Sequence, residues 1–166
     1  GCCVVSGRRR TSTCCVMELR WTTKRFADLT VHELYDLLRL RVDIFVVEQT
    51  CPYPEIDGQD QHAVHLFASD KDGALIACAR ILPPEKDDRP HIGRIAVRKD
   101  LRGKGIASEL MHRALEIVKE QYGSRRSALA AQAHLEHYYA RFGFRRHGPD
   151  YIWDGIPHVD MRREEI

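Results

Sequence analysis

The sequence has no apolar run that approaches the roughly 20 residues of a membrane-spanning helix, which favours a soluble domain. Its body contains two cysteines, Cys51 and Cys78, too few for the disulfide framework of a small secreted protein. We therefore expect a reducing, cytoplasmic setting. No long basic run follows residue 10, and 26 basic residues nearly balance 24 acidic ones, so charge points neither to nucleic acid nor to an anionic membrane as a partner.

Neither repeats nor low-complexity segments divide the chain, and 166 residues fit one domain with its own core. The first 16 residues, GCCVVSGRRRTSTCCV, have no helical or strand period. We interpret 1–16 as a flexible leader, an expression-derived segment or sequence upstream of a start at Met17, so that the domain spans 17–166. The cysteines and histidines show none of the usual zinc spacings, and no metal site is predicted.

Local patterns in the first third of the chain predict a strand, a helix and a loop. The alternation in residues 19–26 predicts the strand, and Thr30 with Glu33 has the spacing of a capping box at a helix start. Apolar residues then recur at three- and four-residue steps, and we expect this stripe to face the core: Val31, Leu34, Tyr35, Leu38, Val42 and Phe45. Residues 51–60, CPYPEIDGQD, predict a loop.

The rest of the chain predicts alternating strands and helices. Strands at 64–68 and 74–82 are expected to pair antiparallel about Asp72-Gly73, and another strand is expected at 91–97. A helix at 106–122 ending at Gly123, a strand at 127–133, a short helix ending at Gly143 and two strands about Gly148-Pro149 follow. Because a helix joins the strands at 91–97 and 127–133, they are expected to be parallel, which makes the fold α/β with a mixed sheet.

The turn DLRGKGIA, residues 100–107, lies where a predicted strand gives way to the longest predicted helix. Helix N-termini leave backbone N–H groups unpaired and carry partial positive charge, so they attract phosphate. Gly103 and Gly105 would allow close backbone approach, while Arg102 and Lys104 add charge. The turn suits a pyrophosphate, although a tight glycine turn without a ligand explains the same residues, and the P-loop and dinucleotide spacings are absent.

Two motifs resemble those of the GCN5-related N-acetyltransferase (GNAT) superfamily. Arg102-x-x-Gly105-x-Ala107 resembles its loop for the pyrophosphate of acetyl-CoA, and residues 139–144, YARFGF, resemble its Tyr-x-x-x-Gly-Phe segment after the fifth strand. LRLRVDIFVVEQTCPYPEIDGQD, CARIL, IGRIAV, AQAHL and DGIPHVDM are similar to the ElaA branch. The resemblance spans about residues 19–163 and implies the acyl-CoA N-acyltransferase (GNAT) fold, a single three-layer domain whose fourth and fifth strands splay around pantetheine.

The same resemblance implies which residues would hold acetyl-CoA, the expected donor. Three backbone positions of the strand at 91–97 would pair with pantetheine, and one of their N–H groups would polarise the thioester carbonyl: Ile95, Ala96 and Val97. The pyrophosphate would be held by Arg102, Gly103, Lys104, Gly105, Ile106, Ala107 and Ser108. Gln132 stands where many relatives have an asparagine that contacts the cofactor.

Proton transfer gives three candidate catalytic residues. Tyr139 matches the tyrosine that protonates the departing thiolate in many relatives; helix packing is the alternative. An attacking amine needs a base, and Glu48 is one candidate because its apolar VVEQ context would raise its pKa; the alternative is a structural pair with an arginine. His65 is the second candidate, because imidazole exchanges protons near neutral pH.

The acceptor is expected to be a primary amine of a small molecule or peptide. Arg41, Arg80 and Arg94 would suit a carboxylate or phosphate on it, whereas Tyr53, Asp57 and Asp60 would hold an ammonium. Alternatively, the two sets pair with each other as a structural network.

We predict an N-acetyltransferase that works by direct attack in a ternary complex, without Cys51 as a covalent carrier. An acyltransferase like the acyl-homoserine-lactone synthases, which share the superfamily fold, is one alternative. A regulatory module that binds CoA without turnover is another. The sequence leaves a homodimer open.

Overall fold

An eight-stranded mixed sheet runs through the part of the chain that the computed structural model describes, residues 17–165, in the order β1-β2-β3-β4-β5-β8-β6, with β7 paired to β8. The strands are β1 (Arg20–Arg25), β2 (Val64–Ser69), β3 (Leu75–Leu82), β4 (His91–Val97), β5 (Ser127–Gln132), β6 (Phe144–Arg146), β7 (Tyr151–Trp153) and β8 (Ile156–Arg163). The predicted leader, 1–16, lies outside the described residues.

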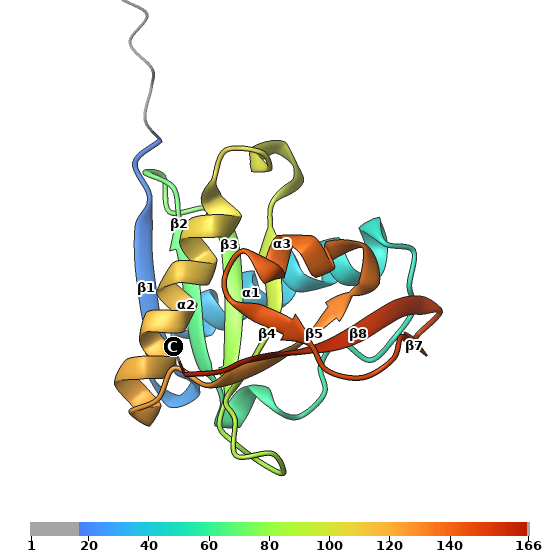
Figure 1. Ribbon diagram of the computed structural model, residues 1–166. Coiled ribbons are helices and arrows are strands. Elements are labelled where there is room, and N and C mark those ends of the chain that lie inside the picture. Colours follow the sequence, from blue (N-terminus) through green and yellow to red (C-terminus); the bar gives the residue numbers. More distant parts are fainter. Residues whose placement is uncertain (1–16, 166) are drawn as a thin grey trace, which may run out of the picture.

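Helices cover both faces of this sheet. They are α1 (Val31–Arg41), continued by the π-helix η2 (Val42–Glu48), then α2 (Ile106–Tyr122) and α3 (Glu136–Ala140), with 3₁₀ turns η1 (Phe26–Asp28), η3 (Asp60–His62), η4 (Lys99–Leu101) and η5 (Ala133–Leu135). Figure 1 shows α2 and α3 in front of the sheet and α1 behind it. The predicted mixed α/β fold in three layers is confirmed. None of the helices in 17–165 combines the length and the apolar character needed to cross a bilayer.

Local sequence signals place several element ends correctly. The Thr30 hydroxyl accepts the Glu33 N–H at 3.1 Å and the Glu33 carboxylate accepts the Thr30 N–H at 2.9 Å, so the capping box starts α1 as predicted. Gly73, at φ +84°, turns β2 into β3, and Gly123, at φ +67°, ends α2. In each case the signal involves residues close in sequence, which is why the chain alone predicts it.

Helix α1 buries a different face from the predicted one. Leu37, Leu40 and Ile44 pack on the sheet, whereas Val31 and Tyr35 of the expected stripe are 82% and 66% exposed. The buried positions also recur at helical spacing, so two apolar stripes compete in this sequence. The inward stripe also carries a buried arginine, Arg41, whose carboxylate partners come from the loop that follows.

The C-terminal segment forms three strands rather than the two predicted. After the turn at Gly148, β7 ends at Trp153, and Asp154 and Gly155 reverse the chain into β8 at φ values of +48° and +77°. Two consecutive residues at positive φ are typical of a tight hairpin turn, for which Asp-Gly is a strong signal. The sequence therefore contained the missing turn.

A gap opens in the sheet between β4 and β5. The strands are parallel, as predicted, and the structure pairs them at one position, His91 with Ala128. Beyond it, β5 pairs with β8 along its length while β4 pairs with β3 on its other edge. The facing edges of the second halves of β4 and β5 are therefore left apart, and backbone groups there can pair with something other than this sheet.

Candidate active site

The glycine turn after β4 forms a pocket at the N-terminus of α2. Gly103 and Gly105 adopt φ values of +76° and +81°, a conformation that side chains disfavour, and Gly105 caps α2. The pocket measures about 370 Å³ and is lined by Val97, Leu101, Arg102, Gly103, Gly105, Ile106, Ala107, Ser108, Tyr138 and Arg141. The predicted loop residues other than Lys104 therefore come together. Helix starts leave N–H groups unpaired, and such groups suit a pocket of this kind to an anion.

Two lining residues were not assigned from the sequence, Tyr138 and Arg141. The Tyr138 hydroxyl is buried and has no hydrogen-bond partner among the described residues. The Arg141 guanidinium lies 4.8 Å from the centroid of the Tyr138 ring. A buried donor without a partner costs free energy, so its position on the pocket wall indicates a group that a ligand would satisfy. Their spacing of three places both on one face of the helical segment, a signal that the sequence did offer.

Arg102 is held by Glu48 across the pocket rim. Its Nε donates to the Val97 carbonyl at 2.9 Å, and its terminal nitrogens donate to both Glu48 carboxylate oxygens, one at 3.0 Å. These hydrogen bonds from Arg102 lower the pKa of Glu48. The expectation of a buried Glu48 with a raised pKa is wrong, because the side chain is 31% exposed and paired. The alternative of an arginine partner is the one observed.

Strand β4 carries a β-bulge beside the gap. Cys78 pairs with Ala96 and Arg80 with Gly93, so Arg94 and Ile95 together face one residue of β3. Arg94 sits at φ +51°, in the left-handed region that few non-glycine residues adopt. The bulge turns the backbone of the predicted pantetheine-binding segment, 95–97, at the level where β4 has left β5.

Tyr139 lies within the core that α2 and α3 share, and it is not among the residues that line the pocket. It is 7% exposed and meets Tyr138 in an edge-to-face contact, with ring centroids 5.2 Å apart. Burial, with a smaller contribution from Tyr138, raises the pKa of the Tyr139 phenol. The phenol therefore keeps its proton at neutral pH, as a proton donor must.

The six predicted acceptor-binding residues form one network instead of two separate sets. The Arg41 guanidinium binds Asp60, with one contact at 2.7 Å, and Arg80 binds Asp57 and Asp60 at 2.8 and 3.1 Å. Arg94 reaches Asp57 at 3.2 Å. The structure thus supports the alternative of mutual pairing, and three arginines share their charge with the loop carboxylates.

Glu55, which the sequence analysis did not assign, joins this network at its centre. It is 4% exposed and accepts hydrogen bonds from Arg41, from Arg94 at 3.0 Å and from the Tyr53 hydroxyl. With Glu55 the network holds three arginines and three carboxylates, so its formal charge is zero. Its partly exposed edge is at Arg94 and Asp57, and Arg94 belongs to the bulge of β4 beside the gap.

His65 and Gln132 lie at very different distances from the gap. His65 is on β2, separated from β4 by β3, and its Nε2 lies 2.9 Å from the Asp60 carbonyl. Burial lowers its pKa, and this position does not support the predicted role as a base. Gln132 ends β5 at the gap and donates to the Gln49 side chain at 3.2 Å, which links β5 to the segment after η2.

A split parallel strand pair with an anion-binding turn beside it defines an acyltransferase of the acyl-CoA N-acyltransferase fold. The Acetyltransferase (GNAT) domain family matches residues 42–165, so the chain belongs to the GNAT acetyltransferase family.

The similarity to known proteins covers most of the chain. Protein ElaA of Escherichia coli is 41% identical over 151 residues, covering 89% of this chain and 98% of ElaA, and its crystal structure superposes with a TM-score of 0.82. The structure of an acyl-CoA N-acyltransferase from Pseudomonas aeruginosa is 45% identical, covers 88% of this chain and 99% of that one, and gives a TM-score of 0.84. The AHL synthase LasI, 17% identical with a TM-score of 0.73 over 88% of this chain and 89% of its own, shares the fold alone.

Proposed function

We propose that this protein transfers an acetyl group from acetyl-CoA to a primary amine of a small molecule or peptide, by direct attack in a ternary complex. The observation that carries the proposal is the juxtaposition of the gap between β4 and β5 with the glycine pocket at the start of α2. The pocket at the start of α2 would bind the donor phosphates on one face of the sheet. The gap between β4 and β5 would let the thioester reach the other face.

The donor would be held mainly by backbone groups. The N–H groups at the start of α2 would bind the pyrophosphate, with the Ser108 and Tyr138 hydroxyls as further donors on the pocket wall. Pantetheine would pair with the free edge of β4 at 95–97, where one N–H would stabilise negative charge that develops on the thioester oxygen. The Tyr139 phenol would then donate its proton to the departing sulfur.

The acceptor would approach from the α1 side. The neutral network of arginines and carboxylates leaves no large net charge there, so we expect the acceptor to be selected by individual contacts with the exposed edge of Arg94, Asp57 and Tyr53. A cytoplasmic setting and transfer without an acyl-enzyme intermediate complete the proposal.

The two rival functions have less support. A lactone-forming synthase would need a site for a longer acyl donor, and the match to LasI extends to the fold alone. A CoA-binding module without turnover would have no use for a tyrosine that protonates a departing thiolate.

Calorimetric titration with acetyl-CoA tests the donor site. Wild type should bind with a micromolar Kd, and Gly105→Val, which places a branched side chain at the pocket mouth, should lose at least 10-fold in affinity. Gly73→Val is the matched control, because Gly73 has a similar φ of +84° but lies in the β2–β3 turn. Absence of binding to wild type would overturn the proposal.

A further inference from the structure

Neither Glu48 nor His65 offers a free proton acceptor at the gap between β4 and β5. Glu48 is occupied by Arg102, and His65 lies two strands away with its Nε2 against a carbonyl. An ammonium acceptor must nevertheless lose a proton before its nitrogen can attack. On the face of the sheet that α1 covers, β8 carries another candidate base.

Strand register places His158 beside the gap. Gln132 lies four residues beyond the one β4–β5 pair, His91 with Ala128, and because the bulge adds one residue to β4, the β4 residue at the matching height is Ala96, about 13 Å along the strands at ~3.3 Å per residue. His158 is the cross-strand partner of Gln132. It therefore stands one strand beyond the gap, one step past the bulge.

The side chain of His158 projects toward the acceptor face. The neighbouring pair, Ala131 and Val159, is buried in the core beneath α2 and α3, and side chains alternate along a strand. Gln132, which shares a face with His158, reaches Gln49 on the α1 side. His158 therefore lies on the face from which the acceptor would approach.

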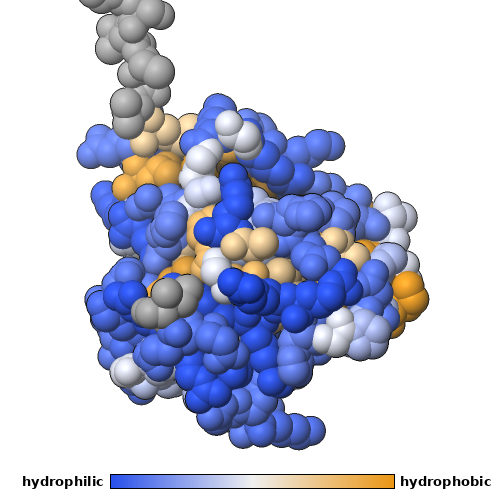
Figure 2. Space-filling view, in the orientation of Figure 1, coloured by the Kyte–Doolittle hydropathy of each residue, from blue (hydrophilic) through white to orange (hydrophobic). Residues whose placement is uncertain are grey.

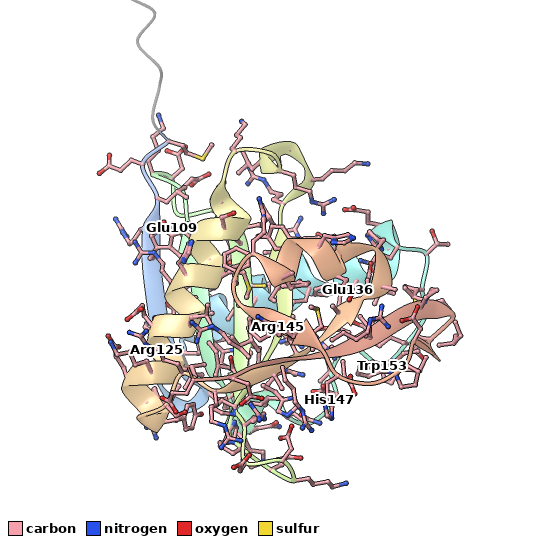
Figure 3. The ribbon with its side chains drawn as sticks, in the orientation of Figure 1. Glu109, Arg125, Glu136, Arg145, His147 and Trp153 are labelled. Carbon is pink, nitrogen blue, oxygen red and sulfur yellow. The ribbon has the colours of Figure 1, made fainter. Side chains whose placement is uncertain are left out.

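The His158 ring is held in one tautomer. Its Nδ1 lies 2.8 Å from the Ile156 carbonyl oxygen, which can only accept, so Nδ1 carries a hydrogen and the neutral ring has its lone pair on Nε2. The half-buried ring packs against Tyr151 and Trp153, with centroids 6.1 and 5.6 Å away. Figure 3 shows Trp153 at this end of the sheet, and Figure 2 shows an apolar patch at the right-hand edge of the view, where Figure 1 places β7.

Few charged groups surround this ring. The titratable groups nearby are the Tyr151 phenol, which donates to Asp160 at 2.7 Å, Asp154 in the turn, and Cys51, whose thiol donates to the Asp154 carbonyl at 3.2 Å. Gln132 and Gln49 on the gap side are neutral. No described arginine or lysine is bound to the ring, so no cation competes for Nε2.

We propose that His158 is the general base that deprotonates the acceptor ammonium. Nε2 takes one proton, the freed amine forms the C–N bond with the thioester carbon, and the C–S bond breaks. The sulfur takes the Tyr139 proton, the second proton of the nitrogen restores Tyr139 through solvent, and His158 releases its proton to water. This inference rests on the proposed acetyl transfer.

Two small amines separate this role from a structural one. Propylamine is an ammonium ion at neutral pH and needs a base, whereas hydroxylamine is largely uncharged there and does not. His158→Asn keeps an N–H donor for the Ile156 carbonyl and removes Nε2. Thiol release from acetyl-CoA should fall on the order of 10²-fold with propylamine and less than about 3-fold with hydroxylamine. His147→Asn, an exposed histidine labelled in Figure 3, is the matched control and should change neither rate.

Equal losses with both amines, or no loss with either, would overturn the assignment of His158 while leaving the proposed function intact. If wild type releases thiol with neither amine, the proposed function itself fails, and the inference fails with it. Acetyl-CoA affinity, measured for each variant, should stay unchanged in His158→Asn.

Discussion

The Glu48–Arg102 pair gives a prediction with an unusual sign: loss of a carboxylate should strengthen donor binding. The pair occupies both terminal nitrogens of Arg102, at the rim of the pocket proposed for pyrophosphate. Bound phosphate would compete with Glu48 for this guanidinium and would also meet its negative charge. In Glu48→Gln both penalties fall away, so acetyl-CoA should bind more tightly.

The magnitude follows from the exposure of the pair. The Arg102 side chain is 40% exposed and the Glu48 side chain 31%, and ion pairs with this degree of exposure contribute about 0.2–1 kcal/mol. This corresponds to a Kd lower by about 1.4- to 5-fold at 25 °C, and the difference should shrink as salt is added. Because Arg102 lowers the pKa of Glu48, the carboxylate stays charged at neutral pH, and the gain disappears only as the pH falls through that lowered pKa.

Calorimetry at low salt measures this change. Glu136→Gln is the matched control, because Glu136, labelled in Figure 3, pairs with Arg146 at a similar 29% and 39% exposure outside the pocket lining. Pantetheine, which lacks the pyrophosphate, should bind both variants as it binds wild type. Weaker acetyl-CoA binding by Glu48→Gln would refute the reasoning, because Glu48 would then be orienting Arg102 for the donor.

Four further predictions concern the tyrosines and the network. Tyr139→Phe should lower turnover by about 10²-fold or more and leave acetyl-CoA affinity unchanged. Tyr138→Phe should weaken acetyl-CoA affinity by about 2- to 10-fold. The same change should leave thermal stability equal or higher, because it removes a buried hydroxyl that has no partner. Arg41→Met should cost about 3–5 kcal/mol in denaturant unfolding, because it leaves three carboxylates with two arginines and so one uncompensated negative charge in a buried network; an equal cost for the exposed Arg39→Met would contradict this. Burial raises the pKa of Asp57, but hydrogen bonds from Arg80 outweigh this effect and lower the pKa to about 2. The stability that Asp57 contributes should therefore be complete above the ordinary pKa of an aspartate and lost as the pH falls toward 2. A free energy of unfolding that stays constant through this acid range would exclude the contribution of Asp57.

Sequence patterns predicted the elements whose signals are local. The capping box at Thr30, the hairpin at Gly73 and the end of α2 at Gly123 each depend on residues within a few positions. The crossover through α2 predicted the parallel pair by topology alone. The Asp154-Gly155 dipeptide is also a local signal for a turn. Because this turn was not predicted, strand β7 was missed.

Contacts between distant segments were out of reach of these patterns. The inward face of α1 depends on Arg41 meeting carboxylates 14 and 19 residues away, and Glu48 meets Arg102 across 54 residues. An apolar neighbourhood in sequence therefore gave the wrong direction for the pKa of Glu48. The register that brings His158 to the gap likewise exists only once β5 and β8 are paired.

The central claim is acetyl transfer to an amine without an acyl-enzyme, and rapid-quench mass spectrometry of wild type mixed with acetyl-CoA and an amine panel tests it most directly. We expect N-acetylated amine to form in step with free CoA while the protein stays unmodified throughout. Free CoA with an acetylated protein, or no acetylated amine from any primary amine in the panel, would contradict it.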